Sequence, residues 1–342
     1  FGLMKKSVLI TICILLSLVM GSIQMYAQQQ QVIDSLLRII ESTSSDSVRI
    51  YNMGEVAWLY INVKPQIALE YAHKGLKLSE KTSHKKGISV SLNCLGAAHT
   101  TIGNFDSALV YYERRLDLVE QMKDTLGIAA AIDNISVIHL YKRNYYTALK
   151  LREESNNIYK EAEKTLLLAH GYVWIGNIYL SQEKFDLALH YYLEAKRIFE
   201  KEKDSGAAYA LVNIGTVYRR MKNYEQAIEN LEKSKDLFEE RGDLNGVGSA
   251  LYRIATIYYD MKDREKYLET LFQAEEVLTN VGNEYFLSLV NSRLADEYKL
   301  VEDYEKALFY LNKTLAYGEK SGAQDATTIA LHGMATVHYA RK

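Results

Sequence analysis

The sequence of 342 residues has little proline, cysteine and tryptophan, with one, two and two copies. The single proline, Pro65, excludes proline-rich linkers and collagen-like sequence and favours helix throughout. Two cysteines, Cys13 and Cys94, cannot form a disulfide framework. The 41 basic residues nearly balance the 43 acidic ones, so the net charge of −2 gives no electrostatic footprint for nucleic acid or an anionic membrane.

Residues 1–27 have the pattern of a secretory signal peptide. Lys5 and Lys6 form a basic start, residues 8–20 are apolar, and a more polar stretch ends at Ala27. Residues 1–3 precede Met4, a natural-looking start, and are interpreted as extraneous. The alternative is an uncleaved membrane anchor, although the apolar stretch is shorter than the ~20 residues that a spanning helix needs. The sequence predicts an exported protein, periplasmic or at the cell surface, with membrane tethering if the signal is retained.

The rest of the chain repeats itself with a period of about 40 residues. An alanine recurs at Ala68, Ala108, Ala148, Ala188, Ala227 and Ala307, and Tyr267 replaces it in a degenerate copy. A small residue precedes these positions from the second copy on, at Gly96, Ser136, Gly176, Gly215, Ala255 and Ala295. A ring follows each small residue, at His99, His139, Tyr179, Tyr218, Tyr258 and Tyr298. Three marks that share one period predict a repeat architecture.

Each repeat is predicted to be a helical hairpin. Apolar residues from Leu92 to Ile102 and from Ala108 to Val119 follow helical spacing. A short polar joint, Gly103-Asn104 in this copy, separates the two runs. We expect the small residue and the alanine to face each other where the two helix axes approach closely, with the rings filling the space around them. These features indicate an all-α fold.

The spacing Leu211-x-x-Ile214-Gly215-x-x-Tyr218, followed by Tyr224-x-x-Ala227, resembles the tetratricopeptide repeat (TPR). The period is longer than the 34 residues typical of the family, and longer helices fit the difference. The resemblance implies a TPR α-solenoid, a right-handed superhelix of antiparallel hairpins whose first helices line a concave groove. The expected parts are a lead helix at 28–45, a divergent first repeat at 46–85, six repeats at 86–323 and the first helix of a truncated repeat at 324–342.

Residues 34–40, 46–52 and 68–72 look like the exported TPR region of bacterial sensor histidine kinases and related signalling regulators. This resemblance implies the extracytoplasmic sensor region of a bacterial membrane signalling protein. The last helix lacks its partner at Lys342, which suggests a fragment of a longer protein. The alternative is a freestanding exported TPR adaptor or assembly scaffold.

Motifs for chemistry are missing from the sequence. It contains no phosphate-binding loop, dinucleotide-binding glycine pattern, nucleophile elbow or zinc-protease motif. His99 and His139 stand where other repeats have tyrosine, so they are interpreted as core rings. Cys94 is interpreted as a small buried residue. We therefore expect no enzyme activity, no cofactor and no metal.

The remaining functional candidate is the predicted groove. Helical spacing selects side chains that project toward it. The candidates are Asn93, Asp133, His170, Asn177, Tyr209, Thr216, Arg219, Arg220, Tyr252, Tyr259, Asp296 and Lys299. Asn177 can donate to and accept from a peptide backbone, and Arg219 can clamp a carboxylate. The expected partner is a protein or peptide segment in the groove, with no nucleic acid, and with a membrane only through an uncleaved signal or a span downstream.

Overall fold

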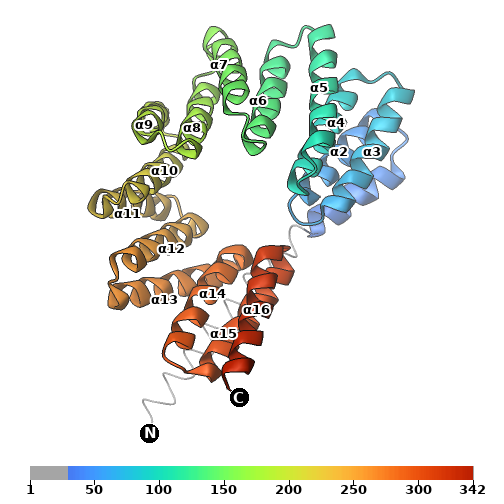
Figure 1. The fold of residues 1–342 in the computed structure, drawn as a ribbon. Helices are drawn as coiled ribbons and strands as arrows, with labels where there is room; N and C mark the ends of the chain where they lie inside the picture. Colours follow the sequence, from blue (N-terminus) through green and yellow to red (C-terminus); the bar gives the residue numbers. More distant parts are fainter. Residues whose placement is uncertain (1–29, 342) are drawn as a thin grey trace. The chain divides into compact units, whose positions relative to one another are not determined.

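The computed structural model describes residues 30–341, which are helical with short turns and contain no strand. The predicted signal peptide lies outside these residues. A helical segment at 30–42 precedes a series of antiparallel hairpins (Figure 1). The first helices of the hairpins are α2 (Asp46–Tyr60), α4 (Lys85–Thr101), α6 (Thr125–Tyr141), α8 (Thr165–Ser181), α10 (Gly206–Arg220), α12 (Leu244–Met261), α14 (Glu284–Leu300) and α16 (Gln324–Ala340). The second helices are α3 (Pro65–Lys81), α5 (Phe105–Gln121), α7 (Tyr145–Glu161), α9 (Phe185–Lys201), α11 (Tyr224–Glu240), α13 (Arg264–Val281) and α15 (Tyr304–Ser321).

The described residues form two compact units that divide after Ala210, inside α10. We name them the N-terminal unit, residues 30–210, and the C-terminal unit, residues 211–341. Within each unit, helices pack against their neighbours in sequence, and first helices of adjacent hairpins also touch, as α2 does with α4 and α12 with α14. The hydrophobic core is therefore a series of small local clusters, as expected for an all-α solenoid.

The polar joints predicted from the sequence are the turns of the hairpins. The first residue of each joint has a positive φ, for example 76° at Gly103 and 59° at Arg143. The second residue is the N-cap of the second helix, and the Asp263 and Asp303 side chains accept hydrogen bonds from the backbone N–H groups of Lys266 and Lys306. Each joint thus ends one helix with a left-handed residue and begins the next with a cap.

The small residue of each repeat makes room for a large side chain from the second helix. A Cβ atom at Gly96 would lie 2.5 Å from Cε1 of Tyr112, and one at Gly176 would lie 2.6 Å from Cε1 of Tyr192. In the next copy, Ser136 Oγ donates a hydrogen bond of 2.8 Å to the carbonyl of Ala148, the repeated alanine. The predicted close approach of the two helices is confirmed in these hairpins.

The repeated rings pack between the two helices of their own hairpin. His99 stacks on Tyr111 at 5.3 Å, Tyr179 on Tyr191 at 5.6 Å, and Tyr298 on Tyr310 at 5.4 Å between ring centroids. Offset stacking of this kind adds about 0.5–1.5 kcal/mol to the burial of each ring. The interpretation of these rings as packing groups is confirmed for these three pairs.

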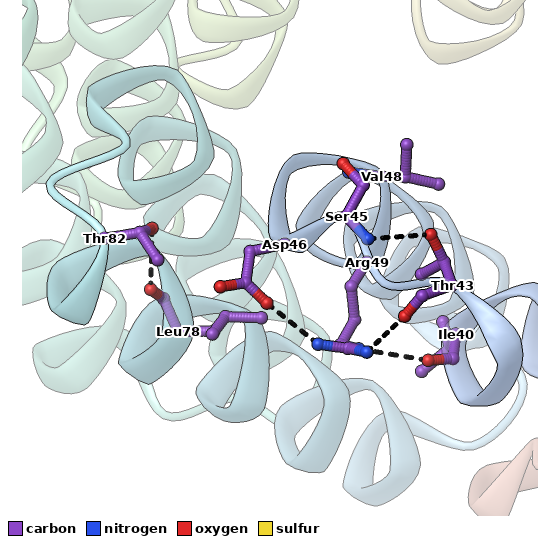
Figure 2. A network of polar contacts seen from close by, with 8 residues as sticks. All are labelled: Ile40, Thr43, Ser45, Asp46, Val48, Arg49, Leu78 and Thr82. Atoms are coloured by element: carbon purple, nitrogen blue, oxygen red, sulfur yellow. Dashed lines mark hydrogen bonds and ion pairs between the residues drawn. The ribbon is translucent and has the colours of Figure 1, made fainter.

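Segment 30–42 is fastened to α2 by Arg49 (Figure 2). The Arg49 guanidinium donates to the carbonyls of Ile40, at 3.1 Å, and of Thr43, and it pairs with Asp46 at 2.8 Å. These bonds satisfy carbonyl groups that the end of a helix leaves without a partner. Ile40 also packs in a small cluster with Met53 of α2.

A membrane-spanning helix was also sought within residues 30–341. None of the helices there combines the length with the apolar character needed to cross a bilayer.

Candidate functional site: the first-helix face

Within each unit, adjacent first helices lie side by side, and we name the surface that they form the first-helix face of that unit. Side-chain pairs join these helices across the repeats. In the N-terminal unit, Asn134 Nδ2 on α6 donates to Asn93 Oδ1 on α4 at 2.8 Å. In the C-terminal unit, Arg219 Nε on α10 donates to Asp260 Oδ2 on α12 at 2.6 Å. Two groove candidates, Asn93 and Arg219, thus take part in contacts between adjacent first helices.

Two candidates in the N-terminal unit pack on rings of a second helix. Asn177 Oδ1 accepts a hydrogen bond of 2.6 Å from the hydroxyl of Tyr192, and no bond to another described residue uses its Nδ2 group. The ring of His170 meets the edge of Phe199 at 4.9 Å. Asn177 thus keeps a donor for a ligand, as the sequence predicts, while its acceptor oxygen is already occupied.

Asp133 is the centre of a polar network inside its own hairpin. Its carboxylate pairs with Arg152, of which the side chain is only 2% exposed, and accepts a hydrogen bond of 2.9 Å from the hydroxyl of Tyr159. Ser155 also donates to it. Burial lowers the pKa of Arg152, and the charge of Asp133 opposes this shift. This carboxylate is thus committed to holding a buried arginine, a role that periodicity alone did not reveal.

The C-terminal unit holds most of the remaining candidates, and several are already paired. Arg219, proposed as a carboxylate clamp, binds Asp260 of the same unit. Lys299 pairs with Asp296 at 2.7 Å along α14. Thr216 Oγ1 donates to the backbone carbonyl of its own helix at Val212.

The tyrosines among the candidates differ in their surroundings. Tyr252 meets the edge of Phe286 at 6.0 Å. Tyr259 leans on Tyr267 at 5.3 Å and is still 54% exposed. Tyr209, in the N-terminal unit, and Arg220, in the C-terminal unit, are exposed. Tyr259 therefore presents an exposed aromatic ring to solvent in the C-terminal unit.

Arg253 on α12 is a functional candidate that the sequence reasoning missed. Its guanidinium is half-buried beside Tyr252, and its Nε group is buried without a hydrogen-bond partner among the described residues. Burial lowers its pKa, and the nearby charge of Arg219 lowers it further. A cation without an acidic partner can receive a carboxylate from a ligand. The sequence feature that could have pointed to Arg253 is its position directly after Tyr252, a predicted groove residue.

A cavity of about 350 Å³ lies on the first-helix face of the N-terminal unit. Its lining residues come from α2, α4 and α5: Gly54, Glu55, Trp58, Ser89, Val90, Asn93, Cys94 and Arg115. Asn93 is the predicted candidate among them. The others were not predicted, although Gly54 and Trp58 have the spacing from Ala57 that Asn93 has from Gly96 and Asn177 from Gly176. The available signal was Trp58, which is 57% exposed.

Two side chains of opposite charge, Glu55 and Arg115, line this cavity, and Asp124 is an acidic neighbour of Arg115. Arg115 Nε donates to Ser89 Oγ at 3.3 Å, while its Nη1 group is buried and makes no hydrogen bond to a described residue. Glu55 makes no hydrogen bond or ion pair with a described residue. Burial raises the pKa of the Cys94 thiol to about 12, with Glu55 raising it further and Arg115 opposing the shift. Cys94 is a buried, protonated thiol, as expected from the sequence.

A metal centre needs several ligands in one place. Within residues 30–341, no group of three or more histidine, cysteine, aspartate or glutamate side chains is arranged to hold a metal ion.

Comparisons with known proteins place these hairpins in a family. Models of the tetratricopeptide repeat match residues 169–202 and residues 206–280. No curated protein matches the chain.

Solved structures share the fold at low sequence identity. Aspartyl phosphate phosphatase F from Bacillus subtilis is 16% identical, with 95% of this chain and 94% of that chain covered and a TM-score of 0.59. The Rap conjugation gene regulator of the plasmid pLS20, in complex with the Phr* peptide, is 12% identical, with 92% and 97% covered and a TM-score of 0.55. A signal transduction ATPase (STAND protein) with a TPR sensor, from Pyrococcus horikoshii, is 20% identical, with 85% and 44% covered and a TM-score of 0.54. The chain therefore contains tetratricopeptide repeats at residues 169–202 and 206–280, and it shares a helical solenoid fold with these structures.

Proposed function

We propose that the chain is a non-catalytic module that binds an extended peptide or protein segment along its first-helix face. The observation that carries this proposal is the set of unused polar groups on that face. Asn177 Nδ2 and Arg253 Nε have no partner among the described residues. Of the two, Arg253 Nε is buried, and a buried polar group without a partner costs about 1–3 kcal/mol, which a ligand that bonds to it would recover.

An extended polypeptide suits these groups chemically. Its backbone presents donors and acceptors at regular spacing, and an asparagine amide matches both. Each unit also has an exposed ring on its first helices, Trp58 in the N-terminal unit and Tyr259 in the C-terminal unit, which adds apolar contact area at low entropic cost. Arg253 adds a receiver for an acidic group.

Structures of the same fold support a peptide partner. The Rap regulator of plasmid pLS20 is in complex with the Phr* peptide, and the STAND protein carries its TPR region as a sensor. We extend both roles to this chain as a proposal. It serves as the extracytoplasmic sensor region of a bacterial membrane signalling protein, and the alternative is a freestanding exported adaptor.

Export is tested by fusing residues 1–45 to an alkaline phosphatase that lacks its own signal. Because the enzyme folds only in an oxidising compartment, we expect activity from this fusion in whole cells. The variant Leu15→Arg places a charge in the apolar stretch and is expected to abolish that activity, whereas Ser44→Arg, outside the stretch, leaves it unchanged. Export would be contradicted if the unaltered fusion and the Ser44→Arg fusion were both inactive in whole cells.

Binding is tested separately by panning a random 12-residue peptide library against immobilised residues 28–342. We expect enrichment of a peptide family that competes in solution with Kd in the micromolar range. The control is the same panning against the protein unfolded in urea. If the folded protein enriches no sequence beyond this control, the binding proposal is overturned, and the export result is unaffected.

A further inference from the structure

The cavity beside Trp58 lies on the first-helix face of the N-terminal unit, where the proposed peptide would bind. It lies between the first helices α2 and α4, and Arg115 lines it from α5 (Figure 1). Its volume of about 350 Å³ is near the lower end of the ~300–1,000 Å³ that ligand pockets have. The cavity therefore has room for one long side chain of a peptide, with some water.

The buried lining residues, Gly54 and Cys94, form the floor of the cavity. The thiol of Cys94 on α4 donates to the backbone carbonyl of Gly54 on α2, with the sulfur 3.7 Å from the oxygen. A Cβ atom at Gly54 would lie 2.8 Å from Cγ1 of Val90, so the two helices meet closely here. Val90 itself is 47% exposed and adds an apolar wall.

The α2 wall of the cavity combines an aromatic ring with a carboxylate. Glu55 and Trp58 are three residues apart on one helix, so their side chains are neighbours on its surface. More than half of the Trp58 side chain is exposed. Glu55 is half-buried and makes no hydrogen bond or ion pair with a described residue. A cation placed on this ring would therefore also meet an unpaired carboxylate.

The guanidinium of Arg115 is already occupied by other groups. Its Nε donates to Ser89 Oγ at 3.3 Å, its Nη1 is buried, and Asp124 is its acidic neighbour. Asp124 follows α5 directly in its own hairpin, so it opposes the charge of Arg115 there. Glu55 belongs to the preceding hairpin and keeps its charge for a ligand.

We infer that this cavity binds one basic side chain, lysine or arginine, of the peptide segment. The cation lies over the indole of Trp58, the ring type that binds cations best, and pairs with the carboxylate of Glu55. The aliphatic stem packs along Val90, because long basic side chains cover apolar surface while their charge stays in a polar place. The inference rests on the proposed peptide binding and adds the residue type that the N-terminal unit selects.

Blocked amino acids test the pocket without a peptide. Residues 28–342 are labelled with ¹⁵N-tryptophan, and the indole N–H signals of Trp58 and Trp174 are followed by NMR. The probes are the N-acetyl methylamides of lysine and arginine. We expect at least one of them to shift the Trp58 signal saturably, with a Kd in the millimolar range, and to leave the Trp174 signal in place. The corresponding norleucine compound keeps the stem without the charge and should bind at least fivefold more weakly.

Variants of the carboxylate assign the contact. Glu55→Gln is expected to weaken binding of the blocked basic amino acid at least fivefold, and Glu55→Lys to abolish it. The matched control Glu113→Lys reverses an exposed charge on α5 outside the cavity and should stay within twofold. Circular dichroism of each variant checks that it folds, and Trp58→Phe assigns the two indole signals.

A peptide from the panning experiment then links the pocket to the proposed function. We expect enriched peptides to share a lysine or arginine at one position. Replacing that residue with norleucine should weaken binding at least fivefold in the wild type and less than twofold in the folded Glu55→Gln variant. This coupling between two distant chemical changes identifies the pair that meets in the cavity.

Two outcomes would overturn the inference. One is a Trp58 signal that neither blocked basic amino acid moves in the folded wild type. The other is full affinity for the norleucine compound, or for the basic compound in the folded Glu55→Gln variant. Enriched peptides with either outcome would leave peptide binding in place and remove this pocket. A Trp58 response without enriched peptides would instead remove the proposed function, so the two failures are distinguishable.

Discussion

At the scale of single residues, the small position packs against the side chain opposite it, which is tyrosine for Gly96 and Gly176 and leucine for Gly215. Gly176 faces Tyr192, whereas Ala295 is at the equivalent position of a hairpin whose opposing residue is Leu311. A methyl group added to Gly176 would strike the Tyr192 ring at 2.6 Å. The fit between the two helices therefore depends on both facing residues and not on the glycine alone.

We therefore expect Gly176→Ala to destabilise the fold by about 1–3 kcal/mol, since the ring must move. Tyr192→Leu alone loses its bond to Asn177 and some volume. The double variant is expected to be less destabilised than the sum of the two, with a coupling energy of about 0.5–3 kcal/mol. Urea unfolding of the four proteins measures this coupling, and simple additivity would contradict the pairing.

The ring histidines predict a pH dependence of stability. Burial lowers the pKa of His99 and of His139 in the folded protein, while the unfolded chain titrates near 6.5. The stability that these neutral rings contribute is complete above that pH and is lost as the pH falls through it, because the unfolded state binds more protons.

Replacing both histidines with the tyrosine found at Tyr179 and Tyr298 should flatten this dependence. We expect His99→Tyr/His139→Tyr to lose less stability than wild type between pH 7.5 and pH 5.5, measured by urea midpoints. An equal loss in both proteins would contradict the role given to these rings.

The 40-residue period predicts which positions recur on the first helices, but it does not predict the partners of the side chains there. Asp133 has the spacing of a groove residue, yet it binds Arg152, which stands where Tyr112 and Tyr192 fill other hairpins. Val212, which has the spacing from Gly215 that Tyr252 has from Ala255, is only 6% exposed. The helical period predicts the direction in which a side chain projects from its helix. Whether that side chain is buried or paired depends on the side chains of the neighbouring helix.

At the scale of elements, the sequence predicts the hairpins and their joints because each joint combines a residue that can adopt positive φ with a cap. The register of α2 was harder to predict. Its hairpin is one residue shorter between Ala57 and Ala68 than the other copies. Counted from Ala57 instead, Trp58 occupies the position that Asn177 has after Gly176, and Gly54 the position that Asn93 has before Gly96.

Segment 30–42 yields a prediction for one element. Arg49→Met removes the bonds to the carbonyls of Ile40 and Thr43, so the segment should open more easily. We expect at least tenfold faster amide hydrogen exchange in residues 36–42 and little change in α4. The control Arg38→Met alters a bond within the segment, from Arg38 Nε to the Asp34 carbonyl. Unchanged exchange in Arg49→Met would show that apolar packing alone holds the segment.

At the scale of the whole molecule, the described helices contact helices of the same or the adjacent hairpin. We therefore expect the effect of a destabilising substitution to stay local. Asp133→Ala leaves the buried Arg152 without its acidic partner, which is expected to cost about 3–5 kcal/mol. Hydrogen exchange should accelerate in α6, α7 and α8 and stay at the wild-type rate in α14 and α15. Uniform acceleration across the chain would indicate a single cooperative unit instead.

The most direct measurement of the central claim, peptide binding on the first-helix face, is a titration of a selected peptide against two tyrosine variants. Tyr259→Ala removes an exposed ring from a first helix, and Tyr146→Ala removes one that is 82% exposed from the second helix α7. For a peptide whose hydrogen-exchange footprint includes α12, we expect Tyr259→Ala to weaken binding at least fivefold and Tyr146→Ala to leave it within twofold. Protection confined to second helices, with the loss of affinity in Tyr146→Ala instead, would contradict the claim.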